Sequence, residues 1–178
     1  MKNLTLSDFC TIILASGNGS RFGMPKSEAK IGGLLFSQKI SKSLLDVGLH
    51  NIVLAKDLDT SSMLDSLRIT IAGIKKEFAY YLIWPVDHPM VQSSTVSILI
   101  ETAIQNPDCI IKPEYIGRRG HPILIPAGLD IHNPVYETLR EVLRHSGVGT
   151  VIVAVDDPGI IQNINTLDDL IRYQDIGG

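Results

Sequence analysis

Near its N-terminus the chain has a short apolar run that leads into a glycine-rich loop, followed by a segment of helical periodicity. The run covers residues 10–15, and the loop extends from Leu14 to Lys26 with the sequence LASGNGSRFGMPK. A glycine-rich turn between a strand and a helix lets backbone N–H groups approach a ligand closely, because no Cβ is in the way. Arg21 and Lys26 add positive charge to this loop. The loop therefore predicts a strand–turn–helix unit that binds a polyphosphate.

Short apolar runs alternate with longer segments of helical periodicity along the rest of the chain. The further strands that we predict are residues 51–55, 80–84, 109–111, 123–125 and 151–155. The predicted helices are residues 35–47, residues 61–77 with a cap at Ser61 or Ser62, a helix capped by Ser93 or Ser94, residues 134–145, and a closing helix capped by Thr166. Because apolar strands alternate with helices, we predict a three-layer α/β/α sandwich around a mostly parallel, Rossmann-like sheet.

Composition narrows the class of protein. The length of 178 residues and the hydrophobic content of 44% are typical of one globular domain, which we expect to span residues 1–178. The net charge of −3 argues against a general nucleic-acid or membrane-surface binder. No apolar run approaches the length of a membrane span and the first residues lack a signal-peptide layout, so we expect a cytoplasmic protein. Cys10 and Cys109 lie in apolar runs, which predicts reduced core thiols.

The glycine spacing differs from that of two common phosphate-binding loops. Gly17, Gly19 and Gly23 give the pattern G-x-G-x-x-x-G, one residue longer than the dinucleotide-binding fingerprint. A P-loop ends in Gly-Lys-Ser/Thr, whereas residues 25–27 here read Pro-Lys-Ser. A turn without a ligand remains the alternative, although two cations in so short a loop favour an anion.

Four segments, in this order, resemble the signatures of the MobA-like nucleotidyltransferases, which include molybdenum-cofactor guanylyl- and cytidylyltransferases. The glycine loop is similar to L-x-[AS]-G-x-[SG]-x-R-[MF]-G-x-x-K, and residues 85–91, PVDHPMV, resemble the metal-binding D-x-P-x-V segment. Residues 117–122, GRRGHP, resemble the R-G-H-P element of the cytidylyltransferase branch. Residues 162–170, QNINTLDDL, resemble the closing N-x-[DN]-T-P-E-D-L motif, with Asn165 as in the guanylyltransferase branch. The resemblance implies a fold of the nucleotide-diphospho-sugar transferase type.

The resemblance also implies a reaction: Mg²⁺-dependent transfer of an NMP from CTP or GTP to a phosphorylated acceptor, with release of pyrophosphate. A molybdopterin-type cofactor is the first candidate for this small-molecule acceptor. The residues that would bind the nucleotide are Leu14, Ala15, Ser16, Gly17, Asn18, Gly19, Ser20, Arg21 and Lys26. Arg21, Lys26 and Asp87 form the predicted catalytic set. Arg21 would clamp the β- and γ-phosphates and Lys26 would lie near the α-phosphate. Asp87 would hold Mg²⁺, which usually takes one or two carboxylates plus phosphate oxygens.

The remaining predicted site residues fall into two groups. Asn163 and Asn165 would be further metal ligands, and the contacts to the acceptor or to phosphate would be Arg118, Arg119 and His121. Structural alternatives stay open, because Asp87 could cap a turn, the arginines could be a solvated pair and the asparagines could hold the turn before the last helix. His88 is expected to be structural or to face solvent.

Two other functions stay open. The acceptor could be a sugar or alcohol phosphate, as in related nucleotidyltransferases. The short segment 56–79, where family members usually have an additional strand, suggests a nucleotide-binding module without catalysis. We expect neither a nucleic acid nor a membrane as partner, and the sequence does not indicate an oligomeric state.

Overall fold

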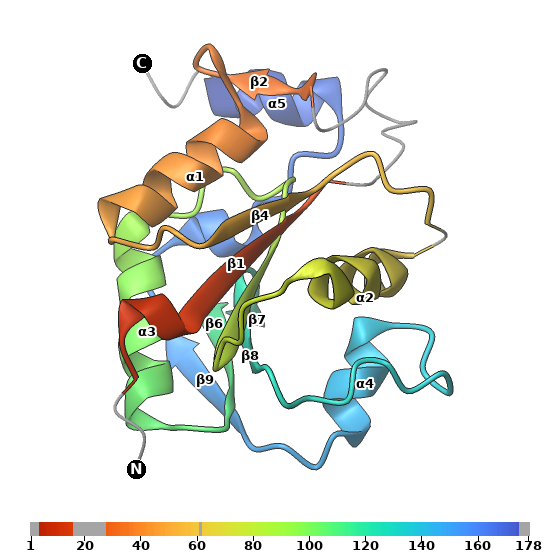
Figure 1. Ribbon diagram of the computed structural model, residues 1–178. Coiled ribbons are helices and arrows are strands. Elements are labelled where there is room, and N and C mark those ends of the chain that lie inside the picture. The colour runs from red at the N-terminus through yellow and green to blue at the C-terminus, as the bar shows by residue number, and fades with distance from the viewer. Residues whose placement is uncertain (1–3, 16–27, 61, 175–178) are drawn as a thin grey trace.

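The computed structural model describes residues 4–15, 28–60 and 62–174, and its centre is a seven-stranded sheet (Figure 1). The strand order is β4-β1-β5-β8-β6-β7, and β9 also pairs with β6. The strands are β1 (Phe9–Leu14), β4 (Ile52–Ala55), β5 (Tyr80–Pro85), β6 (Ile110–Tyr115), β7 (Arg118–Arg119), β8 (Ile123–Pro126) and β9 (Thr150–Ala154). β1 runs parallel to β4 and β5, and β6 runs parallel to β9, whereas β8 is antiparallel to both β5 and β6. The predicted mostly parallel sheet is confirmed.

Helices cover both faces of this sheet. They are α1 (Phe36–Asp46), α2 (Met63–Gly73), α3 (Ser93–Gln105), α4 (Leu139–His145) and α5 (Leu167–Gln174). A small hairpin of β2 (Lys30–Ile31) and β3 (Leu34–Leu35) lies beside α5 (Figure 1). The described residues also form the short 3-10 helices η1 (Leu6–Asp8) and η3 (Pro158–Ile161). In the part of the chain that the structure describes, no helix is long and apolar enough to span a bilayer.

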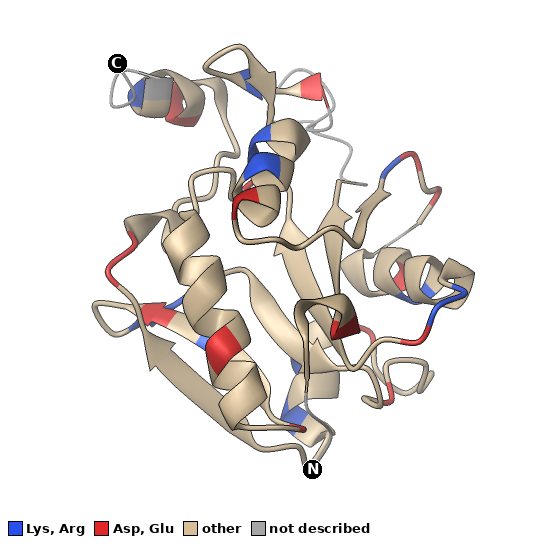
Figure 2. Ribbon diagram, turned by 60° about the vertical axis from the view of Figure 1, so that its left-hand side comes forward, with Lys and Arg blue, Asp and Glu red and all other residues tan. Residues whose placement is uncertain are grey.

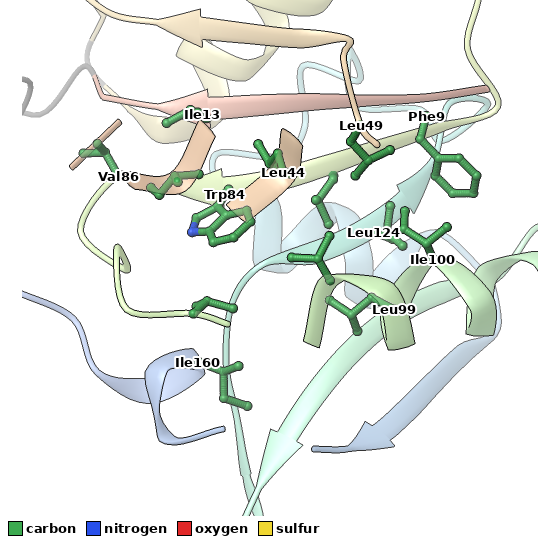
Figure 3. Close-up of a cluster of buried hydrophobic side chains, with 14 of the residues drawn as sticks. Phe9, Ile13, Leu44, Leu49, Trp84, Val86, Leu99, Ile100, Leu124 and Ile160 are labelled. Carbon is green, nitrogen blue, oxygen red and sulfur yellow. The ribbon is translucent and has the colours of Figure 1, made fainter. Parts of the chain in front are cut away.

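Successive residues of β1 point to opposite faces, and a hydrophobic cluster forms on each. On one face Phe9 and Ile13 share a cluster with side chains of α1 and α3, and the fully buried Trp84 lies within it (Figure 3). On the other face Ile12 and Leu14 share a cluster with side chains of α2 and α4. The predicted three-layer α/β/α sandwich is therefore confirmed.

The fourth predicted helix is shorter than the apolar spacing indicated. We predicted residues 134–145, but α4 begins at Leu139 and Val135 is 78% exposed. Thr138 starts the helix through a capping box, in which its Oγ1 accepts from the Glu141 N–H at 3.2 Å and the Glu141 carboxylate accepts from the Thr138 N–H at 3.0 Å.

Arg68 of α2 explains why the residues before α4 stay irregular. Its guanidinium donates to the carbonyls of Ile131, Asn133 and Tyr136 at 2.7, 2.7 and 3.0 Å. These bonds tie residues 131–136 to α2 along a non-helical path. The second predicted helix, residues 61–77, is also too long, since α2 ends at Gly73, but the Ser62 cap is confirmed by an acceptor bond from the Asp65 N–H.

The two cysteines are free thiols, as predicted. Cys10 is buried in β1, and this burial raises the pKa of its thiol to about 11. Cys109 is half-buried and packs against the cluster that contains Trp84. A protonated thiol in an apolar environment behaves as a small hydrophobic side chain.

Candidate functional site

Asp87 follows β5 at the carboxyl end of three neighbouring parallel strands. Pro85 pairs with Leu14, and the Val86 N–H donates to the Leu14 carbonyl at 2.9 Å. Asp87 therefore lies just beyond the end of β1, where the glycine loop starts. In open α/β sheets ligands bind outside the carboxyl ends of the strands, so this is where a site is expected.

Only the first two predicted nucleotide-binding residues are described by the structure. Leu14 and Ala15 are both buried, one in each hydrophobic cluster, and the Ala15 N–H donates to the Ala55 carbonyl at 2.8 Å. Their side chains thus anchor the start of the loop in the core. The predictions for the other loop positions lie outside the described residues, namely those for Ser16, Gly17, Asn18, Gly19, Ser20, Arg21 and Lys26.

His88 is the site residue whose position the sequence did not reveal. Its Nδ1 lies 2.9 Å from Asp87 Oδ1, and the two side chains are only 10% and 18% exposed. The backbone of His88 is held as well, because its N–H donates to the Pro85 carbonyl and its carbonyl accepts from the Trp84 indole N–H at 3.0 Å. The expectation that His88 is structural or faces solvent missed this bond to Asp87. The available signal was the histidine beside a carboxylate within a proline-bounded turn.

His121 adds a second imidazole to the site. Its ring packs edge-on against the ring of His88, with centroids 5.1 Å apart, and its buried Nδ1 has no hydrogen-bond partner among the described residues. Burial lowers the pKa of His121 to about 4, and the nearby His88 contributes to the shift. The imidazole of His121 is therefore neutral at pH 7.

The backbone around His121 is locked to the segment after β9. The Gly120 N–H donates to the Pro113 carbonyl at 3.0 Å, and the His121 N–H donates to the Ile160 carbonyl at 2.9 Å. A Cβ on Gly120 would collide with the backbone carbonyl of Ile160. Glycine is required here because the two backbones touch.

Asp157, which follows β9, ties the same segment to α3. Its Oδ2 accepts from the Gln92 N–H at 2.9 Å and from the Thr95 hydroxyl at 2.7 Å, and its Oδ1 accepts from the Gly159 N–H at 2.9 Å. The side chain is buried, with 2% of the residue exposed. The predicted cap of α3 at Ser93 or Ser94 is wrong, because the N-cap residue is Gln92, whose N–H donates to the Asp157 carboxylate.

The two predicted asparagine ligands flank a direct contact with Asp87. The Ile164 N–H donates to the Asp87 carbonyl at 2.8 Å, which brings Asn163 and Asn165 to the neighbourhood of Asp87. The backbone N–H groups of Asn165 and Thr166 both donate to the Asp169 carboxylate, whose own N–H donates to Thr166 Oγ1. The predicted Thr166 cap of the closing helix is thus confirmed.

Carboxylate and amide oxygens are the ligand types that Mg²⁺ prefers, so Asp87, Asn163 and Asn165 fit that ion. Within residues 4–15, 28–60 and 62–174 no group of three or more His, Cys, Asp or Glu side chains could hold a metal. A soft-metal centre of the zinc type therefore has no ligand set in the described residues. The three side chains offer oxygen atoms, the ligand type that hard cations take.

The predicted acceptor residues Arg118 and Arg119 lie on β7, which pairs with the end of β6. Both are exposed, and they stand opposite Tyr115 and Glu114. The other strands of the sheet carry no Lys, Arg, Asp or Glu, so this hairpin is the charged part of the sheet (Figure 2). Burial lowers the pKa of Lys112 on β6, and the positive charges of Arg119 and Arg140 lower it further. Lys112, Arg119 and Arg140 thus lie close enough for their positive charges to interact.

A match to a family model identifies the chain as a nucleotidyltransferase. A family model described as the MobA-like NTP transferase domain matches residues 53–159, and the chain belongs to that family. The match includes Asp87 and the 117–122 segment. It begins after the glycine loop and ends before Asn163.

The chain is also similar to individual proteins, one by sequence and two by structure. The chain is 27% identical over 199 residues to a probable molybdenum cofactor guanylyltransferase of Bacillus cereus (strain Q1), covering 95% of this chain and 97% of that protein. The crystal structure of an Rv0371c homologue from Mycobacterium sp. strain JC1 has a TM-score of 0.72 at 20% identity, covering 96% of each chain. Molybdopterin-guanine dinucleotide biosynthesis protein A from Archaeoglobus fulgidus has a TM-score of 0.68 at 15% identity, covering 93% of this chain and 97% of that one. These two structures share the fold.

Proposed function

We propose that this chain transfers an NMP from GTP or CTP to a phosphorylated acceptor of the molybdopterin type, with Mg²⁺, and releases pyrophosphate. The observation that carries the proposal is the position of Asp87 at the end of β5, beside the start of the glycine loop and hydrogen-bonded to Ile164 between two asparagines. The name of the Bacillus cereus relative favours GTP. The R-G-H-P element at residues 119–122 is the feature that keeps CTP as the alternative.

The chemistry needs positioning and positive charge rather than a nucleophilic side chain. An acceptor phosphate attacks the α-phosphate in line, and charge grows on the non-bridging and leaving oxygens. Mg²⁺ would supply a cation that neutralises part of this charge, and Asp87, Asn163 and Asn165 would hold it. Arg21 would clamp the β- and γ-phosphates, and Lys26 would stabilise charge at the α-phosphate.

The acceptor would bind beside His121 and the β6–β7 hairpin. The ring of His121 contacts that of His88, next to Asp87, and Arg118 and Arg119 precede His121 on the exposed hairpin.

We also propose that the whole chain acts as a single domain. The seven-stranded sheet includes β1 near one end of the chain and β9 near the other. The proposed metal and triphosphate contacts lie on segments that follow β1, β5 and β9.

Pyrophosphate release tests the proposal most simply. Purified protein with Mg²⁺ is offered each of the four NTPs together with molybdopterin or with a sugar phosphate. We expect release with GTP or CTP and molybdopterin. Release only with a sugar phosphate would contradict the acceptor, and no release with any pair from folded protein would contradict the enzyme.

Loop variants test the predicted phosphate contacts in the same assay. Arg21→Ala and Lys26→Ala should each lower kcat/KM by about 10²-fold, the scale of losing one preorganised charge donor. Lys75→Ala is the matched control, because Lys75 is exposed and precedes the amino end of β5, away from Asp87. Rates near those of the unmodified protein in both loop variants would refute the loop assignment.

A further inference from the structure

We propose that His88 is a positioning residue that orients the Asp87 carboxylate for a divalent cation. The inference rests on the proposed function, since it takes Asp87 as the metal ligand. An ionised carboxylate can only accept hydrogen bonds, so His88 Nδ1 carries the proton and donates it to Asp87 Oδ1 over 2.9 Å. This bond restricts rotation of the carboxylate about its side-chain torsions before any cation arrives.

His88 can orient its neighbour because its own backbone is fixed at both ends. The His88 N–H donates to the Pro85 carbonyl at 3.2 Å, which closes a tight turn directly after β5. The His88 carbonyl accepts from the indole of Trp84, a side chain that is fully buried in the core. The imidazole thus projects from a turn that is tied to the sheet itself.

The backbone of Asp87 is fixed in the same way. Its carbonyl accepts from the Ile164 N–H at 2.8 Å, so the residue is held between the turn after β5 and the segment after β9. The carboxylate itself is set by the side-chain torsions of Asp87, which the backbone bond does not fix. The donor at His88 Nδ1 acts on these torsions, and a preorganised ligand loses less conformational entropy when the cation binds.

His121 keeps the ring of His88 in place. The two imidazoles meet edge to face with an interplanar angle of 60°, and the His121 backbone is bonded to Ile160. His88 is therefore packed against a side chain rooted in a different segment, and its own side chain is only 10% exposed. This packing limits the space in which the His88 ring can rotate.

Mn²⁺ binding, measured by electron paramagnetic resonance or calorimetry, tests this role without relying on turnover. Ligating carboxylates are usually hydrogen-bonded, and loss of such a partner typically weakens metal affinity by about 10–100-fold. We expect a loss of that size in His88→Leu. His88→Asn places an amide N–H near the position of Nδ1 and should recover most of the affinity. His132→Leu, at an exposed histidine before α4, is the matched control and should bind Mn²⁺ as the unmodified protein does.

A kinetic measurement separates positioning from a general structural effect. In His88→Leu the Mg²⁺ concentration for half-maximal rate should rise by about the same 10–100-fold, while the rate at saturating Mg²⁺ is largely kept. If the leucine variant does not fold, His88→Phe takes its place, because it keeps a ring against His121 and lacks the donor. The same loss of Mn²⁺ affinity is expected.

Asp87→Asn distinguishes failure of this inference from failure of the proposed function. If Asp87→Asn binds Mn²⁺ as tightly as the unmodified protein, the assignment of Asp87 as metal ligand is wrong. If Asp87→Asn weakens binding and His88→Leu does not, only the positioning role is overturned. Equal losses in folded His88→Asn and His88→Leu would also overturn it, because the restored donor would then have no effect.

Discussion

The residues around Asp87 and the β6–β7 hairpin both carry predicted site residues, but the fold holds them in opposite ways. Three segments meet around Asp87, at residues 87–91, 120–122 and 157–165, and backbone hydrogen bonds join them. We call these segments the Asp87 junction. The hairpin carries Arg118 and Arg119 on an exposed strand of two residues at the edge of the sheet.

This difference fits the two roles that we propose, metal binding at Asp87 and acceptor binding at the hairpin. A metal ligand and its neighbours act best when they are preorganised, because reorganisation at the moment of reaction reduces electrostatic stabilisation. Exposed arginines can adjust to an acceptor that approaches from solvent, and surface charges contribute little to folding. Substitutions in the Asp87 junction should therefore alter stability strongly, whereas those in the hairpin should alter it weakly.

The largest effect is expected from Gly120→Ala. The added methyl group would collide with the backbone carbonyl of Ile160, and neither backbone can move without breaking the junction. We expect a loss of about 3 kcal/mol or more in unfolding free energy, measured by urea denaturation. Gly128→Ala is the control, since a Cβ there meets nothing within 4 Å. Similar losses in both variants would show that the junction is not tightly packed.

Asp157→Ala should lower the unfolding free energy by a smaller amount. It removes the acceptor for two backbone N–H groups and one hydroxyl, and leaves the Gln92 and Gly159 donors without their partner. The expected loss is about 2–3 kcal/mol by the same measurement, the usual cost of buried unsatisfied groups. Asp156→Ala replaces the exposed neighbouring aspartate and should change stability by under about 0.5 kcal/mol. A small effect at Asp157 would argue against its role as the tie between β9 and α3.

His121 should make stability depend on pH. Its pKa is lowered from 6.5 to about 4 in the fold, so between these values the unfolded chain binds a proton that the folded chain does not. Stability that is fully present above pH 6.5 is therefore lost as the pH falls. From pH 7 to 5 we expect the unmodified protein to lose of the order of 1–2 kcal/mol more than His121→Phe. Identical pH profiles for the two proteins would contradict the burial of a neutral His121.

The smallest effect, and the opposite sign, is expected at the tip of the hairpin. Ile116 has a φ of 48° and is 81% exposed, so a β-branched residue occupies the left-handed region without burying its side chain. Ile116→Asn should stabilise the protein by about 1 kcal/mol in thermal or urea unfolding, because asparagine tolerates this conformation. A loss of stability would mean that the exposed isoleucine makes contacts that outweigh the strain.

The sequence predicted most elements, because the spacing and length of the apolar runs identified the strands and helices. The structure brings Leu14 and Asp87 together, since β1 and β5 are parallel neighbours. The antiparallel direction of β8 was not predictable, because an apolar run of four residues carries no mark of its orientation. The same holds for the α3 cap, which depends on Asp157, and for the irregular residues before α4, which depend on Arg68. These contacts join positions far apart in the chain, so no local pattern encodes them.

The most direct test of the account is pyrophosphate release by Asp87→Ala and Arg119→Ala, compared under identical conditions. Loss of Asp87, the proposed metal ligand, should lower kcat/KM by about 10³-fold, and the defect should persist at saturating acceptor. Loss of the exposed arginine should cost about 10-fold and act mainly through KM for the acceptor, as expected for binding that is equal in the ground and transition states. Near-normal turnover by Asp87→Ala, or a larger defect in Arg119→Ala, would contradict the assignment of catalysis to the Asp87 junction.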